Sequence, residues 1–185
     1  MAGVCISIGC LVNLSCDNRY IGAFLFAFGL ITICQFEYNL FTGKVCYLDD
    51  YKTLALILFF NFIGCIITAL ISNIAYPIKL NEAINMVCIN KLSQSLLSVF
   101  FLGVLCNMMI YFAVDGYRRG NVIILISAIA IFILCGFEHC VANAFYFAFY
   151  TIKERTVSLP IVAFLIVNIF GNYIGGSVMR LIGGY

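Results

Sequence analysis

The sequence has little charge, almost no proline and no tryptophan. Only 10% of its 185 residues are charged, whereas 64% are hydrophobic, and it contains two prolines and one histidine. So little charge excludes an ordinary soluble domain, in which about a quarter of the residues are charged. The net charge of +2 argues against a nucleic-acid partner, because such a partner requires a basic face. The composition instead predicts a chain embedded in a lipid bilayer.

The sequence also lacks the motifs of a membrane enzyme or redox subunit. One histidine excludes a bis-histidine haem within the chain, and there is no His-Glu-x-x-His zinc motif and no Gly-x-Ser-x-Gly elbow. The ten cysteines are scattered without a Cys-x-x-Cys pair, and a free cysteine in an apolar run behaves as a small hydrophobe. We therefore expect no enzyme activity and no metal.

Long apolar stretches account for nearly the whole chain. Since a membrane span needs about 20 residues, we expect six spans within one domain over residues 1–185, at about 2–15, 20–47, 53–75, 92–114, 121–150 and 157–182. The first stretch is short for a span, so the chain looks as though it begins inside its first helix. Residues 76–91 are expected to form a polar connection. Basic residues are divided evenly between the two sets of loops, so they do not indicate the orientation.

Polar residues interrupt two of these stretches, at residues 37–44 and at residues 136–143. The second interruption holds Glu138 and the only histidine, His139, side by side. Within a bilayer, an ionisable residue is costly unless it faces a cavity or a partner. Non-helical backbone at that depth is tolerated only beside protein or water. We therefore expect the two interruptions to meet around one pore.

Short matches relate the two halves of the chain. The six residues from Ile33 resemble the six from Leu134, which begin 101 positions later and share the pattern Cys-x-Phe-Glu. Residues 3–4 match residues 103–104, and residues 61–64 match residues 168–171. With three spans in each half, the second half would insert upside down, which predicts a 3+3 inverted repeat. In this register Glu37 corresponds to Glu138, and both are expected to bind freed backbone N–H groups rather than to do chemistry.

Over its whole length the chain resembles the formate/nitrite transporter family. The resemblance rests on Leu40-Phe41-Thr42-Gly43, on Gly136-Phe137-Glu138-His139-Cys140-Val141-Ala142-Asn143, and on residues 103–107 and 171–176. It implies an all-α integral membrane protein with six helices in an aquaporin-like arrangement, of which helices two and five are broken. It also implies a homopentamer with a pore in each protomer, small weak-acid anions (formate, nitrite, hydrosulfide) and protons as partners, and no cofactor.

The resemblance implies roles for particular residues. His139 would be the central pore histidine with Glu138 beside it, Thr42 would face it from the first break, and Asn107 would be the polar partner in span four. Lys91 would attract anions into the outer vestibule. The outer constriction would consist of Phe26, Leu30 and Phe132, and the inner one of Leu40 and Phe41 with Thr42. Cys140 stands where many members of the family have serine.

Physical chemistry suggests why such a pore needs a cation and a proton donor. Moving an anion out of water has a large desolvation cost, which falls if the anion first becomes its neutral acid. Lys91 could concentrate the anion, and His139 is the side chain that titrates nearest neutral pH. Alternatively the proton comes from bulk water and the positive ends of the broken helices draw in the anion. The sequence leaves both routes open.

Other functions are weighed against anion transport. The bulky phenylalanines at the constrictions favour the small anions over lactate. Pore-lining residues distinguish the small anions poorly, and our order is formate or nitrite first and hydrosulfide second. A neutral-solute pore of the aquaporin type is an alternative, although the paired Asn-Pro-Ala loops of that type are absent. A non-functional truncated fragment is another, suggested by the short first stretch. We expect a multi-pass protein of the cell membrane, in a bacterium the inner membrane.

Overall fold

The computed structural model describes residues 1–76 and 79–183, and every regular element within them is a helix. The elements are α1 (Ala2–Ser15), α2 (Arg19–Gln35), α3 (Phe41–Val45), α4 (Tyr51–Ala75), α5 (Lys79–Leu92), α6 (Leu96–Arg118), α7 (Val122–Leu134), α8 (Cys140–Glu154) and α9 (Leu159–Gly183). The expectation of an all-α protein is thus confirmed for the part of the chain that the structure describes.

Among these helices α4, α6 and α9 are long and apolar enough to cross a membrane, with 25, 23 and 25 residues. Helices α1, α2 and α7 are apolar but shorter. Residues 36–40 are not helical and separate α2 from α3. In the same way, residues 135–139 separate α7 from α8. Helix α4 exposes large apolar side chains such as Phe59, Phe60 and Ile71, as expected of a helix in contact with lipid.

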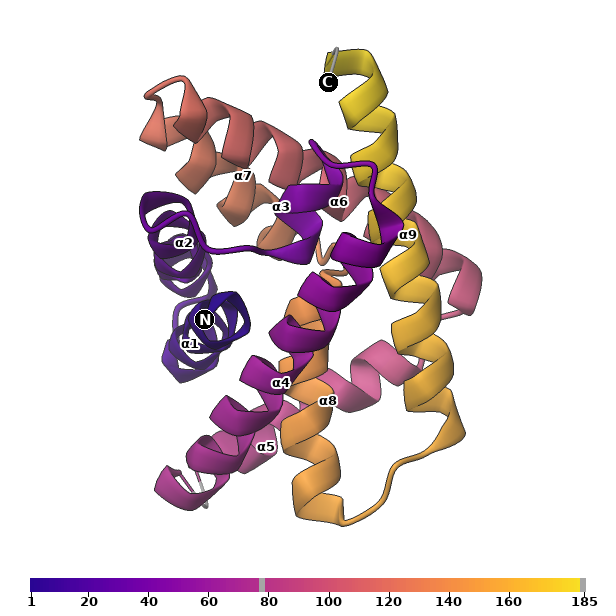
Figure 1. Cartoon of the computed structure of the whole chain (residues 1–185). Helices are drawn as coiled ribbons and strands as arrows, with labels where there is room; N and C mark the ends of the chain where they lie inside the picture. Colours follow the sequence, from indigo (N-terminus) through magenta and orange to yellow (C-terminus); the bar gives the residue numbers. More distant parts are fainter. Residues whose placement is uncertain (77–78, 184–185) are drawn as a thin grey trace.

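The helices pack around α8. Every residue from 140 to 147 is buried, and Phe145, Phe147 and Phe149 are among the largest fully buried side chains. Helix α4 packs on α8, α6 packs on α7 and α9, and α1 packs on α2 and α4. Figure 1 shows α1, α2 and α7 gathered on one side of the molecule and α9 on the other, with α4 crossing between them. The ends of the interruptions that lead into α3 and α8 are buried, at Leu40 and at residues 138–139, whereas residues 36–37 and 135–136 are exposed.

The predicted polar connection at residues 76–91 is wrong for the part that the structure describes, because α5 is a helix. Leu80, Ile84 and Cys88 recur at every fourth position and are at most 1% exposed, which gives α5 one buried stripe. Many polar residues on the other faces masked this pattern in the sequence. Residues 77–78 of the predicted connection lie outside the described residues.

Both interruptions are shorter than predicted, and long-range contacts explain where the helices restart. The N–H of Phe41 donates to Oδ1 of Asn61 on α4 at 2.9 Å, so α3 begins inside the predicted break. The N–H of Cys140 donates to Oδ1 of Asn172 on α9 at 2.8 Å, so α8 begins directly after His139. The first backbone amides of a helix need acceptors from outside it, and asparagines distant in sequence provide them here.

The two interruptions share one pattern of backbone hydrogen bonds. In the first, the N–H groups of residues 36, 37 and 38 donate to the carbonyls of residues 32, 34 and 33. In the second, the N–H groups of residues 135, 136 and 137 donate to the carbonyls of residues 131, 133 and 132. Each bond is repeated 99 positions later. In this register Glu37 corresponds to Gly136, and both have left-handed backbone, with φ of 55° and 70°.

The predicted correspondence of Glu37 with Glu138 is therefore wrong. In the first half the Cys-x-Phe-Glu pattern begins one residue before the end of α2, whereas in the second half it begins one residue after the end of α7. Matching the two patterns therefore pairs identical residues that have different backbone positions. Asn39 is the residue that corresponds to Glu138, and the carbonyls of these two residues have matching partners. Asn61 donates to the carbonyl of Asn39 at 2.9 Å, and Asn168 donates to that of Glu138 at 2.7 Å. The predicted match of residue 61 with residue 168 agrees with these contacts.

Candidate functional site

Thr42, in α3 directly after the first interruption, and His139, at the end of the second, bring the two broken helices into direct contact. Thr42 Oγ1 lies 2.9 Å from His139 Nε2, and the two residues are 0% and 2% exposed. His139 is the N-cap of α8, where its Nδ1 accepts the N–H of Ala142 at 3.1 Å. A ring nitrogen that accepts a hydrogen bond has no proton, so the proton of the neutral imidazole is on Nε2. Nε2 then donates to Thr42, whose hydroxyl hydrogen can reach another acceptor.

Asn107 on α6 completes this buried polar centre. Its Nδ2 donates to the carbonyl of Thr42 at 3.0 Å and lies 3.6 Å from Sγ of Cys46. Because a carbonyl can only accept, these contacts fix the orientation of the amide. Asn107 is 0% exposed, and among the described residues its Oδ1 has no hydrogen-bond partner. The centre therefore contains an acceptor that a solute with a donor would satisfy.

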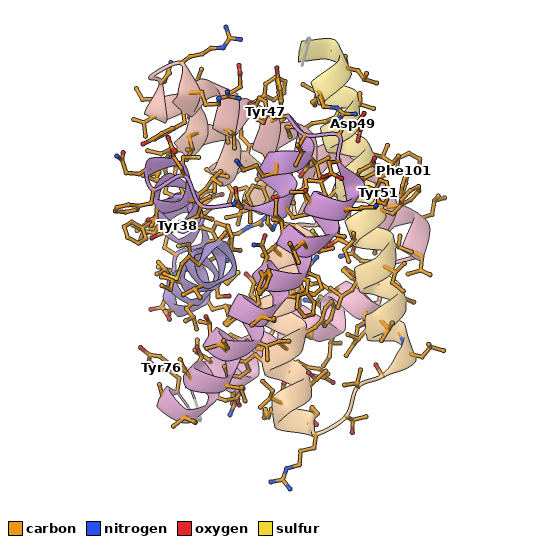
Figure 2. All side chains as sticks on the ribbon, in the orientation of Figure 1. Tyr38, Tyr47, Asp49, Tyr51, Tyr76 and Phe101 are labelled. Carbon is orange, nitrogen blue, oxygen red and sulfur yellow. The ribbon has the colours of Figure 1, made fainter. Side chains whose placement is uncertain are left out.

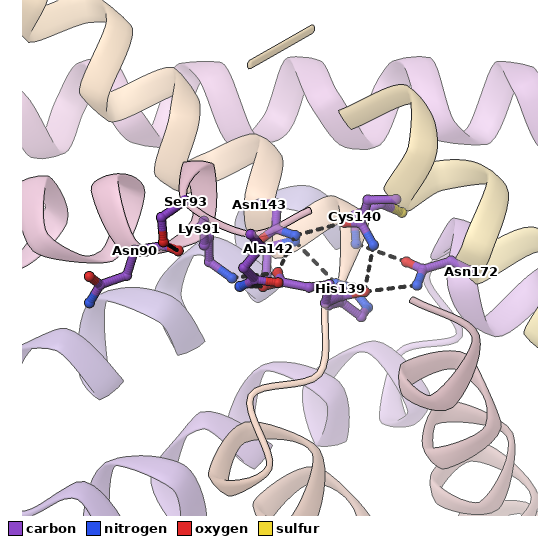
Figure 3. A network of polar contacts seen from close by, with 11 residues as sticks. Asn90, Lys91, Ser93, His139, Cys140, Ala142, Asn143 and Asn172 are labelled. Atoms are coloured by element: carbon purple, nitrogen blue, oxygen red, sulfur yellow. Dashed lines mark hydrogen bonds and ion pairs between the residues drawn. The ribbon is translucent and has the colours of Figure 1, made fainter. Parts of the chain in front are cut away.

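The side chain of Glu138 belongs to a second polar network, whose members include Lys91 and Asn143 (Figure 3). Its carboxylate, 1% exposed, accepts from Lys91 at 2.5 Å, from Gln94 at 2.9 Å and from Asn143 at 2.8 Å. Its backbone carbonyl accepts from Asn168 and Asn172 of α9. These bonds join α5, α8 and α9 around the second interruption. We infer that Glu138 holds the break together and does not set the charge of the imidazole.

Lys91 is consequently not a free cation in the structure. Its ammonium forms an ion pair with Glu138, its side chain is 16% exposed, and it lies 5.8 Å from the centroid of the Tyr146 ring. The resemblance implies that this lysine attracts anions. The structure instead places its charge beside a buried carboxylate that compensates it.

Two phenylalanines of the expected outer constriction lie against each other and against the histidine. The rings of Phe26 and Phe132 meet edge to face with centroids 5.7 Å apart. The ring of Phe132 stacks on that of His139 at 6.0 Å. An apolar pair thus borders the polar centre on one side, as expected for a barrier to ions.

A cavity of about 760 Å³ lies beside the start of α3, where Leu40 and Gly43 flank Phe41 and Thr42 in the sequence. Its lining includes apolar residues (Leu30, Ile33, Leu40, Val114), tyrosines (Tyr38, Tyr47, Tyr117) and charged residues (Glu37, Lys44, Arg118). Figure 2 shows Tyr38 near the end of α2 and Tyr47 near the end of α3. The guanidinium of Arg118 lies over the Tyr47 ring at 4.4 Å. Nothing in the sequence indicated this cavity, because Lys44 and Arg118 are indistinguishable there from ordinary loop charges.

The other residues of the expected constrictions border a cavity and a separate groove. Leu30, which lies one helical turn after Phe26, lines the same cavity as Leu40. Phe41, expected beside Leu40, lines a separate apolar groove of about 350 Å³ between α4 and α9. Consecutive residues at the start of α3 point in different directions, which the sequence match could not reveal.

In the described part of the chain, no cluster of three or more histidine, cysteine, aspartate or glutamate residues could hold a metal ion, and the cysteines are free. Two interrupted helices that meet at a buried polar centre, within an all-helical membrane protein, are typical of channels and transporters. The fold and the site thus define a membrane transport protein.

The chain belongs to the formate/nitrite transporter family, whose model, "Formate/nitrite transporter", matches residues 1–184. A curated relative, the "Formate channel FocA" of Haemophilus influenzae (strain ATCC 51907 / DSM 11121 / KW20 / Rd), is 26% identical over 149 residues, which cover 69% of this chain and 52% of the relative. The match thus spans about half the length of that relative. At the level of the family, the chain groups with channels and transporters and not with enzymes.

Solved structures share the fold over nearly the whole chain. One, described as a pentameric formate channel with formate bound, has a TM-score of 0.82 at 24% identity, with 99% of this chain and 91% of that one covered. A second, described as an FNT family ion channel, has a TM-score of 0.87 at 22% identity, with coverage of 100% and 86%. At such identities the likeness establishes the fold.

Proposed function

We propose that this protein transports small monovalent weak-acid anions together with a proton, formate or nitrite foremost and hydrosulfide second. The observation that carries the proposal is the buried Thr42–His139 pair, at which the two broken helices meet. A relative named as a formate channel and a solved structure described with formate bound support formate in particular.

The proposed path passes from the Phe26–Phe132 pair, through the centre at His139, Thr42 and Asn107, to the cavity bordered by Leu40. An anion between apolar walls loses its hydration without replacement, whereas its neutral acid loses far less. Formic acid and nitrous acid each carry one O–H donor and acceptor oxygens. The unpaired Oδ1 of Asn107 matches the donor, and Nε2–H of His139 or the hydroxyl of Thr42 matches an acceptor.

We infer that His139 acts in this path as a hydrogen-bond donor and that the transported proton comes from bulk water. With Nδ1 accepting the N–H of Ala142, the ring holds a single proton on Nε2. Giving that proton away would leave an imidazolate, so direct donation first requires protonation at Nδ1 and loss of the helix cap. Because Lys91 is paired with Glu138, we propose that it attracts anions only weakly. Glu138 stabilises the backbone of the second interruption.

The proposed architecture has six spans in a 3+3 inverted repeat with an aquaporin-like arrangement. Its first half would be α1, α2 with α3, and α4. Its second half would be α6, α7 with α8, and α9, with α5 between the halves. The repetition of the backbone hydrogen bonds after 99 positions supports this assignment. The proposed assembly is a homopentamer with a pore in each protomer, placed in the cell membrane of a bacterium.

Uptake of labelled formate or nitrite into proteoliposomes across an imposed pH gradient tests the function. We expect uptake by the wild-type protein to follow the pH gradient. Flux of water or glycerol without anion flux would instead establish a neutral-solute pore. Absence of every flux through a well-folded protein would establish a fragment without transport activity.

Two substitutions of His139 separate the proton routes. His139→Asn keeps an N–H donor without an acid, so we expect proton-linked uptake to persist. His139→Leu removes the donor and is expected to lower uptake about tenfold, the effect of one lost hydrogen bond of roughly 1.4 kcal/mol. Loss of uptake in His139→Asn, with thermal stability unchanged, would show that the histidine itself donates the proton.

A further inference from the structure

The mouth of the path next to Phe26 and Phe132 needs a cation other than Lys91. The ammonium of Lys91 lies 2.5 Å from a carboxylate that is 1% exposed. A compensated pair has little net field at a distance, because the two opposite charges largely cancel. An anion that approaches this mouth therefore meets a weaker attraction than a free lysine would exert.

Arg19 is the cation that the fold places at this mouth. It is the first residue of α2 and is exposed. Its Nη2 donates to the carbonyl of Leu134, the last residue of α7, which lies 115 positions later in the sequence. Asn18, whose side chain accepts the N–H groups of Tyr20 and Ile21, fixes the start of α2 and hence the position from which Arg19 reaches across.

The same contact sets Arg19 on the approach to the phenylalanine pair. Leu134 comes two residues after Phe132. Phe26 comes seven residues after Arg19, so both lie on one face of α2, about 10 Å apart along the axis. The rings of Phe26 and Phe132 contact each other. Phe26 is in α2 with Arg19, and Phe132 is in α7 with Leu134, so the Arg19–Leu134 hydrogen bond joins the same two helices. The guanidinium therefore lies at the end of α7 that follows Phe132, and its residue lies on the face of α2 that carries Phe26.

The guanidinium retains the groups that recognise an oxyanion. It has five N–H donors in a planar fork and stays charged at every physiological pH. One bond to Leu134 leaves four donors, among them one parallel pair. Such a pair matches the two oxygens of a carboxylate in a bidentate contact, and nitrite has the same bent arrangement of two oxygens. Hydrosulfide has one sulfur and cannot form two parallel bonds.

We propose that Arg19 receives the anion at this mouth and favours planar anions with two oxygens over hydrosulfide. This inference rests on the proposed function and adds a specificity determinant to it. The anion leaves the guanidinium before it passes Phe26 and Phe132. Arg19 therefore changes the concentration needed for half-maximal uptake and leaves the maximal rate unchanged.

The test is the concentration dependence of uptake into proteoliposomes for formate and for hydrosulfide, with wild-type protein, Arg19→Lys and Arg19→Gln. Arg19→Lys keeps the charge and a donor for Leu134 but loses the fork. We expect its half-saturating concentration for formate to rise about tenfold, as for loss of one charge-assisted hydrogen bond, with hydrosulfide unchanged. Arg19→Gln is expected to raise both. The control is Arg155→Lys, because Arg155 is an exposed residue that follows α8.

The outcomes distinguish this inference from the proposed function. Wild-type protein that transports neither anion contradicts the proposed function. If wild-type protein transports and Arg19→Lys has the same half-saturating concentrations as wild type, the proposed role of Arg19 is contradicted. An equal rise of the half-saturating concentrations for formate and hydrosulfide in Arg19→Lys contradicts it as well. A lower maximal rate with unchanged half-saturation would assign Arg19 a purely structural role. Since lysine can also donate to Leu134, Arg19→Lys decides the matter even if Arg19→Gln does not fold.

Discussion

At the scale of single residues, Glu138 has the most connected side chain of the second interruption. It accepts hydrogen bonds from Lys91 in α5, from Gln94 in the turn after α5 and from Asn143 in α8. A buried carboxylate is tolerated only when its charge and lone pairs are satisfied. Thr42 and His139 are likewise hydrogen-bonded to each other, but neither side chain is charged. The two networks start from adjacent residues of one stretch of backbone.

Removal of the lysine from the buried pair should destabilise the protein. Lys91→Met leaves the carboxylate uncompensated, and we expect a loss of about 3 kcal/mol of unfolding free energy. Adding Glu138→Gln should restore most of it, because the amide is neutral and can still accept from Gln94. Unfolding of the purified protein in detergent measures both. Arg119→Met, which removes an ion pair whose arginine is 73% exposed, serves as the control and should cost less than about 1 kcal/mol. Equal costs at the two sites would contradict this account.

The sequence could predict the polar centre and could not predict the ion pair. Glu138 and His139 are conspicuous in an apolar stretch, and the resemblance implied that Thr42 faces the histidine, as the structure places it. Lys91 and Glu138 are 47 positions apart, and nothing in the residues between them indicates that α5 folds back onto α8. The role of Arg19 depends on a contact across 115 positions. Such pairings arise only from the packing of whole helices.

At the scale of elements, the interruptions were visible in the sequence and their boundaries were not. Polar residues within apolar stretches reveal that a helix is broken. The start of the next helix is decided by Asn61 of α4 and Asn172 of α9. Their side-chain oxygens accept the N–H of the first residue of α3 and of α8, respectively. Local pattern carries no information on such distant acceptors, so both predicted breaks extended too far. The same limitation hid the backbone register, in which Glu37 corresponds to Gly136.

The left-handed residues of the two interruptions should respond in opposite ways to substitution. Gly136→Ala places a Cβ on backbone with φ of 70°, and no atom of the described residues lies within 4 Å of that Cβ. Strain alone should therefore cost about 1 kcal/mol. Glu37→Gly removes the same strain at φ of 55°, and we expect a smaller gain, since glycine loses more entropy on folding. Thermal unfolding of both variants measures the difference. A loss of stability in Glu37→Gly would contradict it and would reveal a contact made by the carboxylate.

At the scale of the whole molecule, one chain supplies both interruptions and every side chain of the polar centre. Thr42, Asn107 and His139 come from α3, α6 and the start of α8 of a single copy. A pore at these residues is complete in each protomer, whatever the number of copies. Large exposed apolar side chains on α4 and α9, such as Phe59, Ile166 and Phe170, leave surface for lipid and for further copies. Assembly would then stabilise the protein in the membrane without building the path.

Mixed assemblies of wild-type and His139→Leu chains test whether each protomer has its own pore. The two chains carry different affinity tags, are co-expressed at several ratios, and are reconstituted after native mass spectrometry has established the number of copies. We expect a mass about five times that of the chain and uptake of formate that falls in proportion to the mutant fraction, because each pore contains one histidine. A pore shared by the five copies would lose activity far more steeply, since a single mutant chain would affect the whole assembly. As the linear reference, wild-type and mutant proteins are reconstituted in separate vesicles, which are then mixed. Uptake by the co-expressed assemblies that falls well below this reference at the same mutant fraction would contradict independent pores.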